Sequence, residues 1–159
     1  MAKSKKDRKL KDIEIVNRKA TYEFFFRDTL EVGIMLTGTE VKSIKNGEAN
    51  LKDAFCFFRK GELFIKNLFI AEFKYGNTNN HETRRLRKLL LKKVELRKWE
   101  RKVKEKGFTI IPHKIYLSER GLIKLEIALG QGKKSYDKRE TIKAKDNKRQ
   151  MERLKKIRL

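Results

Sequence analysis

The sequence predicts an α+β fold built mainly from antiparallel strands, with short helices around a small barrel. Hydrophobic residues make up 38% of the 159 residues, which is enough for a single core. Several segments alternate polar and apolar residues with the period of a half-buried strand. The regular succession of strand, helix and strand that marks a parallel sheet is not seen in the sequence. We therefore expect about three peripheral helices and a basic C-terminal tail.

The first forty-seven residues contain two strand candidates and one short helix. The aromatic run 22–26 and the alternating run 30–36 each predict a strand. Thr39 is a suitable N-cap for a helix that continues through Ile44. Asn46-Gly47 is a typical helix end.

A β-hairpin is expected next. Residues 51–59 and 62–70 are rich in aromatic and branched side chains, as strands are. Lys60-Gly61 between them is a two-residue turn signal. The two strands should therefore pair with each other.

A helical segment is expected in the middle of the chain. In residues 84–106 apolar side chains recur at roughly helical spacing among twelve basic residues, and Gly107 is the expected end. The apolar stripe should dock on the barrel and leave the basic face outside.

The last two strand candidates follow this segment. Residues 108–117 return to strand character, with Pro112 expected at an edge or a bulge. Gly121 turns the chain, and residues 123–129 alternate as a further strand.

The charge is concentrated in three segments. The net charge is +22, and charged residues make up 40% of the chain. Residues 81–106 and 131–159 each carry twelve basic against four acidic residues, a net of +8, and residues 1–11 carry six against one, a net of +5. A nearly neutral body with three basic segments favours a polyanionic partner, which we take to be nucleic acid.

These segments suggest three regions. Residues 1–11 are expected to be a flexible basic arm, and residues 12–130 an RNA-binding barrel domain. Residues 131–159 form the basic tail, which has too few apolar residues to fold alone. Because most of its residues are good helix formers, we expect it to be disordered when free and helical when a polyanion neutralises it.

The sequence offers little for catalysis. Cys56 is the only cysteine and lies between two phenylalanines, where a packed thiol is expected. His81 and His113 have no partner at metal-ligand spacing. We therefore predict no catalytic residue, no metal and no cofactor.

Several side chains suit RNA instead. Tyr22, Phe24 and Tyr75 are candidates for stacking on splayed bases. Four closely spaced cations, expected at the start of a helix, would hold phosphates: Arg84, Arg85, Arg87 and Lys88.

The sequence also indicates where in the cell the protein is expected. No apolar stretch follows the basic N-terminal residues, and no segment approaches the about 18 apolar residues of a membrane span. We expect a cytoplasmic monomer without membrane contacts.

Six stretches in order resemble the SmpB family, and together they span most of the chain. They are residues 17–20 with the aromatic run, 31–43, 47–55, 87–91, 107–112 and 132–139. The chain departs from the family pattern at four positions. Proline, histidine, lysine and tryptophan are usual where this chain has Thr83, Lys92, Gln131 and Asn147.

The resemblance implies an oligonucleotide-binding (OB)-fold-like β-barrel that binds the tRNA-like domain of tmRNA (SsrA RNA). It also implies delivery of tmRNA to stalled ribosomes for trans-translation. The tail would enter the empty decoding centre and mRNA channel as a helix. Elongation factor Tu is an implied partner through the aminoacylated tmRNA complex.

The motifs, together with the basic and aromatic positions above, define the expected site residues. Those expected on the RNA-binding face are Asn17, Arg18, Lys19, Tyr22, Glu31, Lys42, Arg84, Arg87, Lys88, Leu91, Lys124, Lys133 and Lys134. Those expected on the ribosome-binding tail are Asp137, Lys138, Arg139, Ile142, Lys143, Lys145, Arg149 and Leu154.

Two alternative functions remain open from the residues themselves. One is a general ribosome-associated or structured-RNA factor. The other is an RNA-modifying enzyme with a cryptic site, which would use Glu31 or Glu40 with a perturbed pKa.

Overall fold

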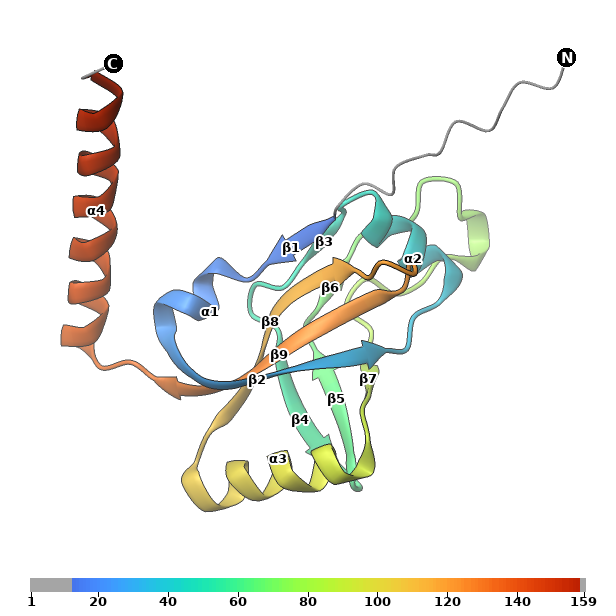
Figure 1. Cartoon of the computed structure of the whole chain (residues 1–159). Helices are drawn as coiled ribbons and strands as arrows, with labels where there is room; N and C mark the ends of the chain where they lie inside the picture. The colour runs from blue at the N-terminus through green and yellow to red at the C-terminus, as the bar shows by residue number, and fades with distance from the viewer. Residues whose placement is uncertain (1–12, 158–159) are drawn as a thin grey trace, which may run out of the picture.

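The structure is a computed structural model that describes residues 13–157. A body of strands and short helices carries one long helix, α4 (Ser135–Ile157), which stands apart from it (Figure 1). The expected basic arm, residues 1–11, lies outside the described residues.

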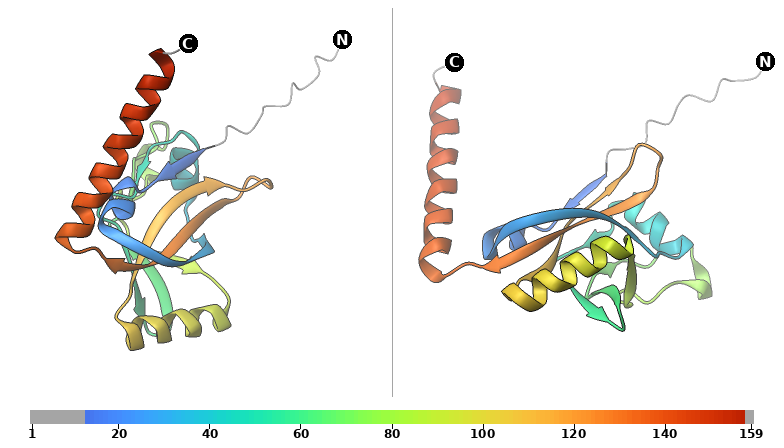
Figure 2. Two further views of the ribbon diagram at one scale, coloured as in Figure 1. Left: turned by 60° about the vertical axis from the view of Figure 1, so that its left-hand side comes forward. Right: turned by 60° about the horizontal axis from the view of Figure 1, so that its bottom comes forward.

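The main sheet closes on itself. Its strands follow the order β1-β8-β4-β5-β7-β2-β9, and β9 also pairs with β8, so six of the seven form a ring (Figure 2). Every pairing is antiparallel, which confirms the predicted fold class. The strands are β1 (Glu14–Val16), β2 (Phe24–Ile34), β4 (Phe55–Arg59), β5 (Glu62–Lys66), β7 (Arg87–Leu90), β8 (Thr109–Leu117) and β9 (Ile123–Gly132).

The core fills the inside of this ring. Along β9 every second side chain points inward, and Leu125, Ile127 and Leu129 are fully buried there. Lys124 and Glu126 alternate with them on the outer face. The period-two pattern in the sequence therefore reports which face of the strand is buried.

The helices lie outside the ring. They are α1 (Arg18–Glu23), α2 (Gly38–Lys45) and α3 (Lys93–Lys106), with Trp99 of α3 buried against the core. A second, two-stranded sheet pairs β3 (Ala49–Asn50) with β6 (Phe69–Ile70), and a short 3₁₀ helix, η1 (Asn77–Asn79), follows it.

Two predictions near the N-terminal end of the body were wrong in detail. Tyr22 lies in α1 rather than in a strand, because the Asn17 side chain accepts a hydrogen bond from the Ala20 amide and caps a short helix. The strand begins only at Phe24. The N-cap of helix α2 is Thr37 rather than Thr39, so the helix begins two residues earlier than predicted.

The predicted helix over 84–106 was also wrong in its first third. Arg87–Leu90 forms strand β7, which pairs with β2 and β5, and the helix starts at Lys93. The leucines that suggested a helix are instead the alternating residues of a strand: Leu89 is buried and Leu90 is 48% exposed. A short apolar run fits either a helix or a strand. Here residues 87–90 form a strand because they pair with β2 on one side and with β5 on the other.

The turn predictions were confirmed. Arg59 pairs with Glu62, and both Lys60 and Gly61 have positive φ, as a two-residue hairpin turn requires. The register of β8 against β9 shifts between Pro112 and Lys114, which places the proline at a bulge. The predicted strands 51–59 and 62–70 are shorter than expected, since β4 begins at Phe55 and β5 ends at Lys66.

The tail is helical and makes little contact with the body. No residue of α4 is buried. Its start is joined to the body by the Lys133 amide, which donates to the Glu23 carbonyl at 2.9 Å. The helical part of the expectation for this segment is present, and its disorder in the free chain stays a prediction.

Replacing Gly61 by alanine should destabilise the protein by about 1–2 kcal/mol, because a Cβ is strained at its φ of +73°. Chemical denaturation measures this loss. Gly38→Ala is the matched control: no atom lies within 4 Å of the added Cβ and φ is ordinary, so stability should not fall. Equal effects of the two substitutions would contradict the assigned turn.

Candidate nucleic-acid interface

Helix α1 carries three of the expected RNA-binding residues, and Asn17 holds it in place. Asn17 is 6% exposed. Its amide group donates to the carbonyls of Leu51 at 3.3 Å and Pro112 at 3.0 Å, and its backbone N–H donates to the His113 carbonyl. Asn17 therefore fixes α1 against β8 and does not itself present a polar group to a ligand.

Arg18 and Lys19 are the exposed cations of α1. The Lys19 ammonium lies 2.7 Å from the Asp53 carboxylate, which raises the pKa of Lys19 and lowers that of Asp53. Arg84 also helps lower the Asp53 pKa by its charge, so it belongs to the same electrostatic neighbourhood. A phosphate entering here would replace Asp53 as the partner of Lys19 at little cost, because exposed ion pairs are weak.

The base of the tail lies beside α1. The Lys133 ammonium donates to the Thr21 carbonyl and to the Thr141 hydroxyl, both at 3.2 Å, and lies 4.9 Å from the centre of the Phe25 ring. Lys133 thus couples α1, β2 and α4, while its neighbour Lys134 is exposed. Half-buried Tyr22 belongs to α1. Helix α1 and the base of the tail together therefore hold five predicted residues: Arg18, Lys19, Tyr22, Lys133 and Lys134.

The outer face of β2, β9 and β8 holds a second group. The Tyr116 hydroxyl donates to the Glu31 carboxylate. Burial and that carboxylate both raise the pKa of Tyr116, so the phenol stays protonated and remains a donor. Lys124 pairs across the sheet with Tyr116 and Gly33, and so shares this face with Glu31.

Three other predicted residues lie elsewhere. Lys42 is on α2, with its ammonium 5.2 Å from the Phe73 ring centre. Lys88 on β7 forms an ion pair with Glu62 at 2.5 Å, and half-buried Leu91 follows the same strand. The predicted residues are therefore spread over several faces of the body.

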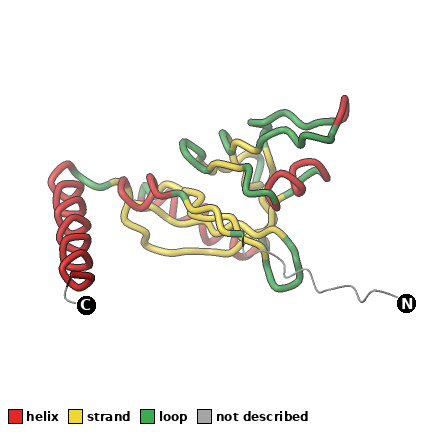
Figure 3. Tube along the Cα trace, turned by 90° about the horizontal axis from the view of Figure 1, so that it is seen from above, coloured by secondary structure: helices red, strands yellow, loops and turns green. Residues whose placement is uncertain are grey.

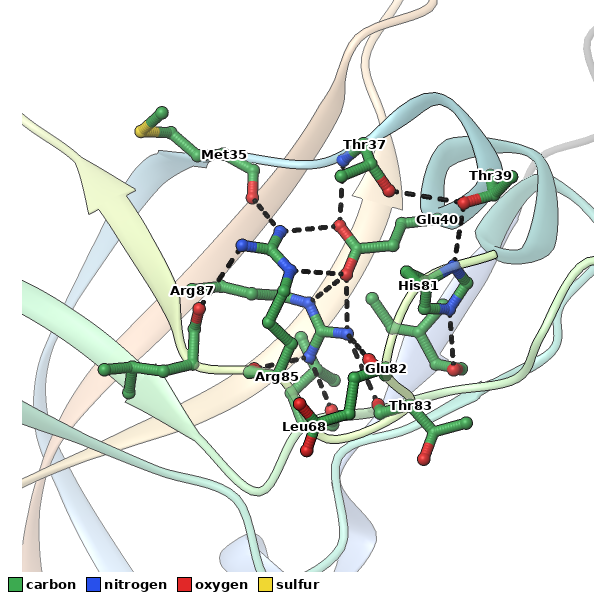
Figure 4. A network of polar contacts seen from close by, with 12 residues as sticks. Met35, Thr37, Thr39, Glu40, Leu68, His81, Glu82, Thr83, Arg85 and Arg87 are labelled. Carbon is green, nitrogen blue, oxygen red and sulfur yellow. Dashed lines mark hydrogen bonds and ion pairs between the residues drawn. The ribbon is translucent and has the colours of Figure 1, made fainter. Parts of the chain in front are cut away.

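Arg87 requires a correction, because it is fully buried. Its guanidinium forms an ion pair with Glu40 at 2.7 Å and donates to the Leu68 carbonyl at 2.7 Å (Figure 4). It therefore cannot hold a phosphate in this structure. The four closely spaced cations of residues 84–88 did not reveal this, since burial of Arg87 depends on the Glu40 carboxylate, which lies 47 residues away in the sequence.

Glu40 is the acceptor at the centre of this network. Its carboxylate also accepts from Arg85 at 2.9 Å and from the Thr37 amide at 2.8 Å, and its side chain has no exposed surface. Burial alone would raise the pKa of Glu40, but these hydrogen bonds outweigh it and lower the pKa.

His81 extends the network from α2 to β6. One ring nitrogen lies 3.0 Å from the Ile70 carbonyl and the other 2.9 Å from the Thr39 hydroxyl. Since a carbonyl only accepts, Nε2 carries a proton. The network therefore pins residues 81–87 onto α2, and this exposes Arg84 at a fixed place.

The predicted tail residues lie along α4. Asp137 accepts from the Lys134 amide at 3.3 Å and so caps the helix start, where a carboxylate is favourable. Lys138, Ile142, Lys145 and Arg149 are spaced by four, three and four residues, which places them on one side of the helix. Leu154 is 57% exposed.

Sequence reasoning missed four residues that complete these groups. They are Phe25, Asp53, Phe73 and Tyr116. Asp53 lies within a stretch that resembles the SmpB family, so its role could have been found. Phe25 likewise lies in the aromatic run of a family-like stretch, whereas Phe73 and Tyr116 were indistinguishable from core aromatics by sequence.

Within residues 13–157, no group of three or more His, Cys, Asp or Glu residues is arranged to hold a metal ion. No helix in the same part of the chain is long and apolar enough to cross a membrane.

The family model described as SmpB protein matches residues 14–157. The chain belongs to the SmpB family. It is similar to the SsrA-binding proteins of Phocaeicola vulgatus (54% identity, 89% of this chain and 95% of that protein) and Moorella thermoacetica (49% identity, 86% and 88%).

A solved SmpB-family structure also resembles this chain. It was reported as "tmRNA-SmpB: a journey to the center of the bacterial ribosome". The TM-score is 0.65 at 44% identity, over 77% of this chain and 86% of that one.

Replacing Glu40 by glutamine should cost about 3–5 kcal/mol, because Arg87 is left buried without its counterion. Denaturant unfolding measures the loss. In protein that already carries Glu40→Gln, the further loss of stability caused by Arg87→Met should be far smaller than the loss that Arg87→Met causes in the wild-type protein. This is the behaviour expected of two coupled residues. Strictly additive effects would contradict the network.

The same pair predicts a pH dependence. Because the pKa of Glu40 is lowered from its ordinary 4.5 on folding, its contribution to stability is present above that pH and lost as pH falls below it. Glu40→Gln should therefore lose less stability than the wild-type protein between about pH 5 and pH 3. Asp28→Asn is the control. Its pKa is also lowered, by Lys102, but its carboxylate is 40% exposed, so the effect should be smaller.

Proposed function

We propose that this SmpB-family chain binds the tRNA-like domain of tmRNA and delivers it to stalled ribosomes for trans-translation. One structural observation carries the proposal: a ring-shaped body with cations on α1 is joined to a projecting basic helix that buries none of its residues. A helix with so little packing needs another molecule to explain its composition.

The body is the part we assign to tmRNA. The cluster at α1 and the tail base gathers several cations around Phe25 and Tyr22, a combination that suits phosphates and splayed bases. Glu31 and Lys124 offer an acceptor and a cation on the neighbouring face. Asn17 and Arg87 act indirectly, by holding α1 and residues 81–87 in place.

The tail is the part we assign to the ribosome. Helix α4 would lie in the empty decoding centre and mRNA channel, where ribosomal RNA surrounds it on several sides. Its cations are distributed around the helix, and an ion pair within it, Arg149 with Asp146, is long at 4.0 Å. Most of its cations are thus available for phosphates.

The relatives support this assignment. They are named SsrA-binding proteins, and the solved structure's description joins tmRNA, SmpB and the bacterial ribosome. We infer a binding protein rather than an enzyme, acting as a monomer in the cytoplasm. Elongation factor Tu would meet it through the aminoacylated tmRNA. The functional division is a barrel domain of residues 12–130 and a tail of residues 131–159.

Binding of the tRNA-like domain should depend steeply on salt. If 6–10 phosphates are contacted, affinity falls by about 10³–10⁵ between about 50 and 200 mM salt. Titrations of wild-type protein and of Arg18→Ala at several salt concentrations measure the slope. Arg18→Ala should reduce it by about one unit. A nearly flat response of the wild-type protein would rule out the basic surfaces as the contact.

Deleting residues 137–159 should leave much of the tmRNA affinity and abolish tagging of proteins on stalled ribosomes. A finer variant, Asn147→Pro, interrupts α4 in its middle while keeping its length and its charge. It should also lose tagging, whereas the matched Asn147→Ala should keep most of it. Full tagging by the truncated protein would sink the assignment of the tail.

A further inference from the structure

The loop between β6 and β7 carries an aromatic side chain, Tyr75, that is not packed into the core. Tyr75 is 74% exposed, whereas the tyrosines of the body at positions 22 and 116 are partly buried. The loop projects from the end of the body opposite α4 (Figure 3). An aromatic side chain this exposed contributes little to folding and leaves its ring open to another molecule.

The loop that carries Tyr75 is closed by hydrogen bonds at its base. The Asn80 side chain accepts from the Phe73 amide at 3.0 Å and donates to the Phe73 carbonyl at 2.8 Å. The Gly76 amide donates to the same carbonyl at 2.9 Å, and a Cβ on Gly76 would meet the Asn80 side chain at 2.8 Å. The turn around Tyr75 is therefore closed by side-chain and backbone hydrogen bonds, so binding would cost little ordering entropy.

Phe73 and Lys74 lie beside the Tyr75 ring, and two further cations lie over neighbouring phenylalanines. Phe73 supports the Tyr75 ring edge-on, with ring centres 5.7 Å apart. The Lys74 ammonium lies 5.9 Å from the Tyr75 ring centre, and the Lys42 ammonium lies 5.2 Å from the Phe73 ring centre. Further along, Arg84 lies over the Phe69 ring at 5.7 Å. A rigid aromatic ring among cations matches the features that bind single-stranded nucleotides.

We propose that Tyr75 is a stacking platform for one unpaired base of the bound RNA, with Lys74 and Lys42 holding the phosphates beside it. This rests on the proposed function and adds to it a contact at the end of the body farthest from α4. A protein partner would favour an apolar surround for Tyr75. The groups placed beside it here are Lys74 and the half-buried Phe73, and Lys42 lies in turn over the Phe73 ring.

The test uses the full-length protein and a transcript of the tRNA-like part of tmRNA. Tyr75→Ala should weaken binding about 5- to 150-fold, the range that loss of one stacked base gives. Tyr75→Phe should stay within about twofold of the wild-type protein, because the ring is retained. Tyr136→Ala is the matched control, since Tyr136 is a 59% exposed tyrosine at the start of α4.

Salt dependence separates stacking from charge. Tyr75→Ala should leave the salt slope of binding unchanged, whereas Lys42→Ala should reduce it by about one unit. Tyr75→Trp adds a direct readout, because its fluorescence should be quenched on RNA binding while Trp99 stays buried in the core. The thermal midpoint of Tyr75→Ala should match that of the wild-type protein.

The outcomes distinguish this proposal from the function on which it rests. If the wild-type protein binds the transcript no better than an unrelated RNA hairpin, the proposed function fails. If wild-type binding is specific but Tyr75→Ala binds as tightly and Tyr75→Trp is not quenched, the stacking platform fails alone. Loss of ribosome binding by Tyr75→Ala with unchanged affinity for the transcript would instead identify Tyr75 as a ribosome contact and overturn the proposal.

Discussion

The buried ion pair between Glu40 and Arg87 is the interaction on which the arrangement of this molecule depends. It joins α2 to β7, and its additional hydrogen bonds tie Arg85 and the carbonyls of residues 68, 82 and 83 to the same point. Two charges without exposed surface are costly unless every polar atom finds a partner, and here the partners are backbone groups from several segments. The pair therefore specifies one register of these segments, and the exposed positions of Arg84 and the Tyr75 loop follow from it.

Closure of the sheet has a second consequence. Because β9 pairs with both β2 and β8, the ring encloses Leu125, Ile127 and Leu129 completely, and α4 buries none of its residues against the body. Helix α4 is attached to the body mainly through Lys133, whose ammonium contacts Thr21 of α1 and Thr141 of α4. The same side chain that would neutralise a phosphate also sets where the tail leaves the body. A phosphate bound at Lys133, as proposed, would therefore also act on the direction of α4.

The charge of +22 is tolerated because the fold spreads it. Cations lie on α1, α3, β7, the loop before β7 and α4, and several of them have acidic neighbours such as Asp53, Asp28 and Glu62. These exposed pairs are weak and are easily exchanged for phosphates. The buried pair is different, since the charge of Arg87 serves the fold and is closed to any ligand.

Much of the fold could be predicted from the sequence alone. Alternation along residues 123–129, the hairpin turn at Lys60-Gly61 and the bulge at Pro112 depend on neighbours a few residues away, so local chemistry determines them. The basic segments and the family motifs likewise predicted the class of partner. Only the tertiary structure decided that Arg87 is buried, that Leu89 lies in a strand, and that Asn17 supports α1 from inside. The physical reason is that an arginine or leucine takes its role from residues far along the chain, such as Glu40, which become neighbours only when the ring closes.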